Sequence, residues 1–243
     1  LDHRIKRNIA EILFLGVLIF GGFLNSLTQY TYRLSLSLEV NTVLAGSLLV
    51  LFFYCIVFLV DVPFSLYKQF VIEERHGFNK MTFALWLTDL AKNAALSSVL
   101  IFPVIYLVLF LITSRVDIGP LWWILLWALV VLLSVSFMII FPLIIAPIFN
   151  KFSPIENGLL KERLEKLLTR CKFKSKGLFT MDGSKRSSHG NAYFAGIGGA
   201  KRIVLFDTLI EKLNEKEIEA VLAHEVGHYK CGHIPSRLIQ SAL

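Results

Sequence analysis

The sequence predicts a mainly helical protein in which a bundle of membrane-spanning helices precedes a smaller, more polar domain. Of its 243 residues 55% are hydrophobic, and the mean hydropathy of +0.64 is too apolar for an ordinary soluble domain. The apolar residues are concentrated in four long runs before residue 150, whereas charged and apolar residues are mixed in the remainder. We therefore expect a transmembrane region over residues 1–149 and a second domain over residues 150–243.

Each apolar run corresponds to one predicted membrane span. A helix needs about 20 apolar residues to cross a hydrocarbon core of about 30 Å, and three of the four runs reach that length. The first run is shorter and has a basic flank, as a signal peptide has, but no small-residue cleavage site follows it cleanly, so we expect a retained span. The predicted spans cover residues of about 9–28, 43–62, 94–113 and 121–141.

The fourth run, from Leu121 to Phe149, is longer than one crossing requires. Pro142 and Pro147 lie near its end, and proline interrupts a helix because it lacks a backbone N–H. We therefore expect the span to end near Ile140 and the remaining residues to form a bent segment packed within the protein.

Basic residues alternate between rich and poor loops along the predicted transmembrane region. The N-terminal flank, the second loop and the segment after the fourth span are rich in Lys and Arg, whereas the first and third loops carry only Arg33 and Arg115. The richer side normally faces the cytoplasm, which predicts a cytoplasmic C-terminal domain. The net charge of +7 suits a protein embedded in a lipid bilayer with anionic headgroups, and we find no motif for nucleic acid.

The domain after residue 150 begins with an amphipathic helix and continues with β structure. Leu residues alternate with charged residues at helical spacing from Leu159 to Cys171, and residues 176–181 have the composition of a strand. A polar loop over residues 184–189 precedes two β-rich segments, 191–194 and 202–206, which flank a glycine-rich turn. This pattern predicts a small β-hairpin.

Two capping boxes predict the helices that follow the hairpin. In a capping box, an N-cap side chain and a Glu three residues later satisfy backbone N–H groups at the start of a helix. Thr208 with Glu211 predicts a helix that runs to Leu213, and Asn214 with Glu217 predicts the next helix. That second helix carries an apolar stripe of Ile218, Val221, Leu222 and Val226.

The second helix also contains the sequence His224-Glu225-Val226-Gly227-His228, an H-E-x-x-H motif. On a helix, His224 and His228 lie one turn apart on the same face, so both can bind one Zn²⁺ ion, with Glu225 beside the metal. Zinc lowers the pKa of a bound water, and the carboxylate can accept its proton as the water attacks a peptide carbonyl. The motif predicts a zinc metalloendopeptidase with two histidine ligands and Glu225 as the catalytic base.

A catalytic zinc site normally takes three protein ligands, and the motif supplies two. No Asp or Glu follows Glu225 in the sequence. His233 lies about half a turn out of phase with His224 on a continuous helix, so we do not expect it to bind the same ion. The absence of an initiator Met and the apolar, helix-like sequence up to Leu243 predict that both ends of the chain are truncated.

Four stretches of the sequence resemble the type I CAAX prenyl protease family, integral-membrane zinc endopeptidases related to the HtpX proteases. The stretches are residues 73–80, residues 141–152, the hairpin segments 187–194 and 201–208, and residues 224–233 around the motif. The resemblance implies a Zn²⁺ cofactor, a third ligand that is a Glu on a later helix, and a catalytic site facing a chamber within the membrane helices. Because no Asp or Glu follows Glu225 in this sequence, the resemblance implies that the third ligand lies beyond Leu243 and that this chain alone is an incomplete enzyme. It also implies removal of the last three residues from proteins with a prenylated C-terminal cysteine.

The resemblance further implies that two residues near the hairpin bind substrate. Asn191 would hydrogen-bond the substrate backbone, with a plain turn residue as the alternative. His189 would stabilise an oxyanion, with an ordinary loop histidine as the alternative. The hairpin edge would hold an extended peptide by β-addition, with a scaffold role as the alternative.

Other functions stay open on the sequence alone. One is an HtpX-like quality-control protease of membrane proteins, and another is a non-catalytic membrane scaffold that retains the zinc fold. A transporter is disfavoured because charges within the spans are scarce. The membrane would be the endoplasmic reticulum in a eukaryote or the inner membrane in a bacterium. The three cysteines, Cys55, Cys171 and Cys231, have no metal-site spacing, and disulfides are not expected in a reducing compartment.

Overall fold

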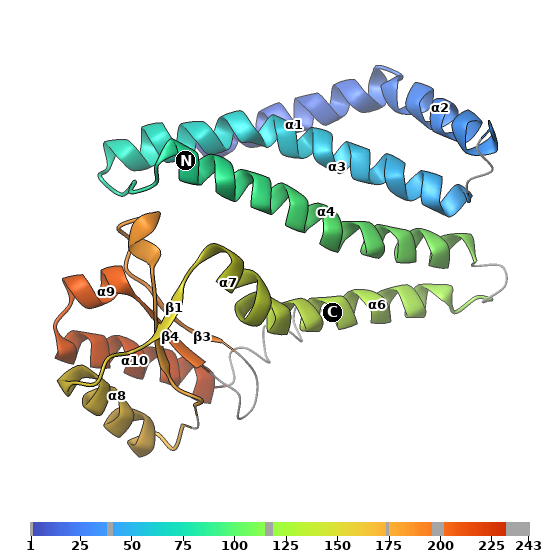
Figure 1. The fold of residues 1–243 in the computed structure, drawn as a ribbon. Helices are drawn as coiled ribbons and strands as arrows, with labels where there is room; N and C mark the ends of the chain where they lie inside the picture. Colours follow the sequence, from blue (N-terminus) through green and yellow to red (C-terminus); the bar gives the residue numbers. More distant parts are fainter. Residues whose placement is uncertain (1, 38–40, 115–118, 174, 196–201, 232–243) are drawn as a thin grey trace. The chain divides into compact units, whose positions relative to one another are not determined.

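The computed structural model confirms a mainly helical fold with a small β-sheet (Figure 1). It describes residues 2–37, 41–114, 119–173, 175–195 and 202–231. The chain forms two compact units, of which the first contains Leu1–His76 and Phe83–Leu129 and the second contains Gly77–Thr82 and Val130–Leu243. The short segment Gly77–Thr82 therefore belongs to the same unit as the C-terminal domain, although its sequence neighbours do not.

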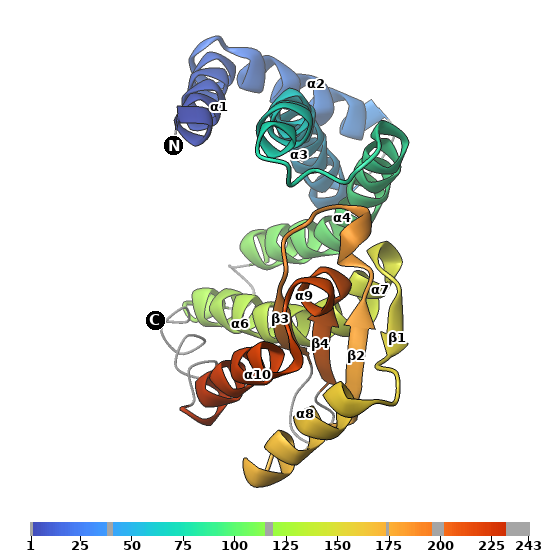
Figure 2. The same ribbon diagram turned by 90° about the vertical axis from the view of Figure 1, so that its left-hand side faces the viewer.

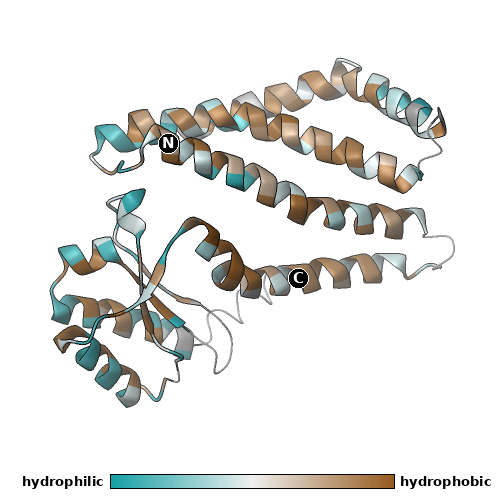
Figure 3. Ribbon diagram, in the orientation of Figure 1, coloured by the Kyte–Doolittle hydropathy of each residue, from teal (hydrophilic) through white to brown (hydrophobic). Residues whose placement is uncertain are grey.

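Long helices with mostly apolar residues form the N-terminal part of the chain (Figure 3). Helices α3 and α4 pack along each other, and many of their large hydrophobic side chains are exposed, as expected for helices surrounded by lipid. The helices are α1 (Asp2–Phe20), α2 (Phe23–Ser37), α3 (Thr42–Tyr67), the π-helical turn η1 (Lys68–Glu73), α4 (Phe83–Thr113) and α6 (Trp122–Ile140).

The first apolar run forms two helices instead of the single helix expected over residues 9–28. The segments Arg7–Leu18 and Phe23–Arg33 are bent by 57° relative to each other. Gly22 lies at the break with a φ of +73°, a left-handed conformation that ends helices and that glycine adopts without steric cost. Hydropathy does not reveal the break because the flanking residues on both sides are apolar.

Three helical segments in the described part of the chain are long and apolar enough to cross a membrane, and the bent α1–α2 pair passes the same test as one broken span. The three segments are Thr42–Glu73, Phe83–Thr113 and Trp122–Phe149. Helix α4 begins at Phe83, well before the apolar run from residue 94, because Asp89 and Lys92 interrupt the apolar composition but not the helix.

The two prolines after α6 coincide with a change of helix type. Residues Phe141–Ile145 form the π-helical turn η2, with Pro142 in its first turn, and Ala146–Phe149 form α7. A π-turn accommodates a missing N–H donor in an otherwise continuous helix. The helix ends where Asn150 adopts an extended conformation. Ile145 and Ala146 are buried, whereas Phe141, Leu143 and Ile144 are exposed, so the protein packing expected for this segment is present only in part.

The second unit contains a four-stranded mixed sheet with the strand order β1-β2-β4-β3. Strands β3 (Ala192–Ala195) and β4 (Arg202–Phe206) pair antiparallel, which confirms the predicted hairpin. Strand β2 (Leu178–Met181) pairs parallel with β4, and β1 (Phe152–Pro154) pairs antiparallel with β2. Strand β1 was not predicted, because three residues ending in proline carry too little periodicity.

Helices α8 (Leu159–Arg170) and α10 (Glu215–Lys230) contact each other and build the core of this unit on one face of the sheet (Figures 1 and 2). Leu164 and Leu205 are fully buried there. The apolar stripe predicted for α10 faces this core, since Ile218, Leu222 and Val226 are each 1% exposed. Complete burial of such side chains stabilises the fold by about 1.5–3 kcal/mol each.

The structure confirms one capping box and contradicts the other. The Asn214 side chain accepts hydrogen bonds from the N–H groups of Lys216 and Glu217, while the Glu217 carboxylate accepts one from the Asn214 N–H at 2.8 Å. Helix α9 (Asp207–Lys212) starts without a side-chain cap. The Thr208 hydroxyl instead donates to the carbonyl oxygen of His189 at 2.8 Å, because the preceding loop lies within its reach.

Candidate active site

Helix α10 directs the residues of the H-E-x-x-H motif to two different environments. His224 and His228 are exposed, and Glu225 is partly buried. With 3.6 residues per turn, the two histidines lie about 140° around the helix from the buried stripe, and Glu225 lies between them and the core. The burial of Val226 thereby fixes the rotation of α10, and this rotation holds the histidine pair away from the core.

The two imidazoles converge on one point. Their Nε2 atoms are 3.0 Å apart, and the rings are perpendicular, with an interplanar angle of 87° and 4.5 Å between centroids. Two nitrogen ligands of a tetrahedral zinc ion, each at about 2.0–2.1 Å from the metal, would be about 3.3 Å apart. The distance and the chemistry of this donor pair therefore fit zinc.

Two histidines alone do not complete a metal site. No group of three or more His, Cys, Asp or Glu side chains that could hold a metal ion is found among the described residues. Cys231, three residues after His228, is exposed, and His233 lies outside the described residues. The described residues therefore supply two of the three protein ligands that a catalytic zinc site normally takes.

The sheet edge next to α10 belongs to strand β3. Helix α10 contacts β3, and β3 is the last strand in the sheet order. The Phe206 N–H donates to the Asn191 carbonyl oxygen at 3.0 Å, so the backbone of Asn191 points toward the partner strand β4. Backbone groups in an antiparallel pair point alternately toward the partner strand and away from it. The register therefore directs the backbone of Ala192 and Phe194 toward the outer edge.

Asn191 immediately precedes this edge strand, and its side chain is oriented by the backbone. Its Oδ1 atom accepts a hydrogen bond from the Ala192 N–H at 2.9 Å. Because an N–H group requires an acceptor, this contact identifies the oxygen of the side-chain amide. The NH₂ group of the exposed Asn191 is then the part of the side chain that can donate to a ligand carbonyl.

His189 is exposed, and its ring stacks on Phe78 with 4.1 Å between centroids and an interplanar angle of 27°. Its carbonyl oxygen accepts the Thr208 hydroxyl, and its N–H donates to Ser187 Oγ at 3.2 Å. The sequence did not reveal the Phe78 contact, because more than 100 residues separate the two rings; the only signal was that both lie in stretches that resemble the same family.

Tyr193 lies on the other face of β3 from the helical core. Its hydroxyl donates to Met181 Sδ at 3.8 Å, and its ring makes an edge contact with Phe206. Burial raises the pKa of the Tyr193 hydroxyl above its ordinary value of 10.0, so the side chain stays neutral at physiological pH. We assign it a packing role.

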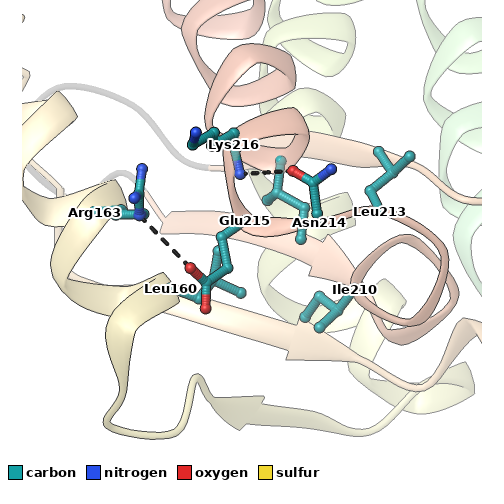
Figure 4. A pocket seen from close by; sticks show the side chains of 8 residues that line it. Leu160, Arg163, Ile210, Leu213, Asn214, Glu215 and Lys216 are labelled. Atoms are coloured by element: carbon teal, nitrogen blue, oxygen red, sulfur yellow. Dashed lines mark hydrogen bonds and ion pairs between the residues drawn. The ribbon is translucent and has the colours of Figure 1, made fainter.

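A cavity of about 740 Å³ lies at the start of α10 (Figure 4). Arg163 forms an ion pair with Glu215 at 3.6 Å beside it, and Asn214, the N-cap of α10, also lines it. Glu215 precedes His224 by nine residues, which is about 14 Å along a helix. The cavity is therefore separate from the histidine pair, and none of its lining residues is a predicted site residue.

An apolar helical region joined to a domain with an H-E-x-x-H helix is the architecture of an integral-membrane metallopeptidase. Residues 3–151 match the family model described as CAAX prenyl protease N-terminal, five membrane helices, and residues 154–243 match Peptidase family M48. The described part of the first range contains α1, α2, α3, α4 and α6, of which the bent α1–α2 pair passes the test for a membrane span as one broken span.

Known relatives agree with the family models. The chain is 50% identical over 174 residues to the CAAX prenyl protease 1 homolog of Arabidopsis thaliana, covering 71% of this chain and 40% of that protein. It is 47% identical over 186 residues to CAAX prenyl protease 1 of Saccharomyces cerevisiae, covering 76% and 40%. The human homolog is 35% identical over 222 residues, covering 76% and 46%. The chain thus spans less than half the length of these relatives.

The crystal structure of S. mikatae Ste24p has the same fold. It superposes with a TM-score of 0.88 at 38% sequence identity, covering 99% of this chain and 56% of that one. The chain belongs to the type I CAAX prenyl protease family of M48 peptidases, and it is an integral membrane protein.

Proposed function

We propose that the protein is a zinc endopeptidase that removes the C-terminal tripeptide of prenylated CAAX proteins. The observation that carries this proposal is the convergence of His224 and His228, whose Nε2 atoms are 3.0 Å apart on the exposed face of α10. His224 and His228 would hold the zinc ion together with a third ligand from elsewhere in the protein. The bound metal would supply the Lewis acidity that makes water nucleophilic near neutral pH.

Glu225 is the proton carrier in this proposal. Its carboxylate accepts a proton from the attacking water as the new C–O bond forms at the scissile carbonyl, and it then delivers that proton to the leaving amine as the C–N bond breaks. Its partial burial beside the histidines supports this role, because a carboxylate held between a packed core and the metal ligands has little conformational freedom to lose.

The outer edge of β3 is the proposed binding surface for the substrate backbone. An extended peptide can pair by β-addition with the outward carbonyl oxygen of Ala192, whose N–H already donates to Asn191 Oδ1, and with the outward backbone groups of Phe194. The Asn191 NH₂ group would donate to a substrate carbonyl at the start of the strand, and His189 would donate to the developing oxyanion. Pairing along one edge next to α10 holds a single carbonyl in register, which the chemistry requires.

The prenylated substrate class is supported by the names of the relatives and by the apolar helices of this chain. A farnesyl group on a C-terminal cysteine is a membrane anchor, so its natural site is within reach of lipid. Each buried CH₂ contributes about 0.8 kcal/mol, and about 1.4 kcal/mol corresponds to a factor of ten. Burial of two CH₂ groups of the prenyl chain is therefore enough for a tenfold preference for a prenylated over an unprenylated substrate.

The test compares a farnesylated peptide ending in an a-a-X tripeptide with an unprenylated twin of the same sequence. The full-length, zinc-loaded protein should release the tripeptide from the farnesylated peptide with at least about tenfold higher kcat/KM. Equal cleavage of both peptides would instead favour a general membrane protease, and cleavage of neither would reject the peptidase proposal.

We further propose that the domain after Asn150 faces the cytoplasm, and that the membrane is the endoplasmic reticulum if the source is eukaryotic or the inner membrane if it is bacterial. The alternating basic loops support the cytoplasmic orientation. Single cysteines at the exposed positions Lys166 and Arg33, in a background without the three native cysteines, should react with an impermeant maleimide from opposite sides of sealed vesicles. Labelling of both positions from the same side would contradict the orientation, and detergent-opened vesicles provide the control in which both react.

A further inference from the structure

The segment Gly77–Thr82 is built into the second unit through the loop that precedes β3. Asn79 and Ser187 form an isolated antiparallel bridge. The Lys80 N–H donates to the Arg186 carbonyl oxygen at 3.2 Å, and the Ser188 N–H donates to the Phe78 carbonyl oxygen at 3.0 Å. A segment that joins two predicted membrane spans thus contributes a short strand-like pairing to the candidate substrate site.

Phe78 also contacts this loop through its side chain. Its ring lies on the imidazole of His189 with 4.1 Å between centroids and an interplanar angle of 27°. This is closer than the usual range of about 4.5–7 Å for aromatic pairs, and the small angle is that of a parallel stack. A stack covers the face of the imidazole, and Phe78 therefore does not cover the ring edge on which the two nitrogens lie.

The backbone of the loop is held independently from its other side by α9. The Thr208 hydroxyl donates to the His189 carbonyl oxygen at 2.8 Å, and the Lys212 ammonium donates to the Ser188 carbonyl oxygen. A Cβ atom added at Gly190 would lie 3.2 Å from the Leu209 Cα atom, so the two backbones pack closely. Loss of the Phe78 ring should consequently remove the stack on the His189 imidazole without releasing the loop.

We propose that Phe78 is a positioning residue for the peptidase reaction, because it holds the His189 imidazole in one orientation beside the edge strand. The inference rests on the proposed function and adds to it a residue from outside the C-terminal domain. His189 lies three residues before β3, where the substrate backbone would begin to pair. An imidazole already fixed by the stack loses no rotational freedom when the transition state forms, so Phe78 acts on kcat more than on KM.

The test is a kinetic comparison of Phe78→Leu and Phe78→Tyr in the full-length, zinc-loaded protein. Leu preserves an apolar side chain without a ring and should lower kcat on the farnesylated peptide about tenfold. This loss is smaller than the decrease in kcat of about 10²–10³-fold that follows complete removal of an oxyanion donor. Tyr preserves the ring and should retain the wild-type kcat. Phe83→Leu is the matched control, since Phe83 also stacks in this structure, on Trp86, but in the first unit. It should leave kcat unchanged.

A double-variant cycle separates positioning from a general loss of structure. If Phe78 acts through His189, then Phe78→Leu should cause no further loss in a His189→Ala background. The proposal would be overturned if the double variant lost kcat by the product of the two single-variant factors. A wild-type kcat in Phe78→Leu would also overturn it. Should Phe78→Leu lose its zinc or its thermal transition, Phe78→Met takes its place with the same expected loss.

A chemical measurement keeps this inference distinct from the proposed function. The rate at which diethyl pyrocarbonate modifies His189, followed by mass spectrometry of its peptide, should rise in Phe78→Leu and stay at the wild-type value in Phe78→Tyr. If wild type cleaves no peptide, the peptidase proposal fails while this rate still reports on the stack. An unchanged modification rate in Phe78→Leu would overturn the positioning role.

Discussion

Replacing Glu225 with Gln should abolish peptide cleavage while leaving the zinc content unchanged. The amide has the shape of the carboxylate but does not accept a proton from water, and loss of a general base typically lowers the rate by about 10²–10⁴-fold. The metal should stay bound, because His224 and His228 converge on it without help from this side chain. The assay is tripeptide release from the farnesylated peptide, with metal analysis of the same preparation.

A matched control is Glu217→Gln on the same helix. Glu217 is exposed, and its carboxylate accepts the Asn214 N–H in the capping box. Gln also completes a capping box, so this variant should keep both activity and zinc. Cleavage by Glu225→Gln at the wild-type rate would show that the base has been assigned to the wrong residue, and loss of zinc in this variant would show that Glu225 is a ligand.

The sequence predicted the elements of the second unit better than their contacts. The α10 helix followed from a capping box and an apolar stripe, because both signals are local and α10 satisfies them. The hairpin followed from two β-rich segments around a glycine-rich turn. The parallel pairing of β2 with β4 could not be predicted, since no local signal specifies which separated strands become neighbours.

Two differences show where local patterns are insufficient. The Thr208 hydroxyl was expected to cap α9, but the His189 carbonyl oxygen competes for it in the folded chain, and a capping motif contains no information about such a partner. The first apolar run was expected as one helix, but the left-handed conformation of Gly22 divides it, and a hydropathy average is insensitive to backbone conformation.

The candidate site was predictable in its residue types but not in its supporting contacts. His224 and His228 followed from their spacing, because a helix places such residues on one face. Two of the stretches that resemble the family meet in space, because Gly77–Lys80 pairs with Arg186–Ser188, and within the hairpin stretch Thr208 holds His189. Residue types alone did not reveal that these stretches form one structural group, since their contacts span much of the chain.

Replacing both His224 and His228 with Ala should remove the zinc from the full-length protein and abolish cleavage. A zinc ion at a catalytic site depends on three protein ligands, and the double variant retains at most one. Metal analysis should therefore fall from about one zinc per chain to the background level. Each single variant should bind zinc more weakly than wild type, because the remaining imidazole keeps only one of the two converging nitrogens.

The fold should survive this change, which makes the loss of metal interpretable. Both histidines are exposed, whereas Ile218, Leu222 and Val226 on the opposite side of α10 are each 1% exposed and are untouched by the substitutions. The apparent Tm should therefore equal that of wild type stripped of zinc by a chelator. His76→Ala is the control, since His76 is also exposed and its Nδ1 lies 2.8 Å from the Ile72 carbonyl oxygen; this variant should keep its zinc. An unchanged zinc content in the double variant would refute the assignment of the metal to α10, whatever the outcome of the cleavage assay.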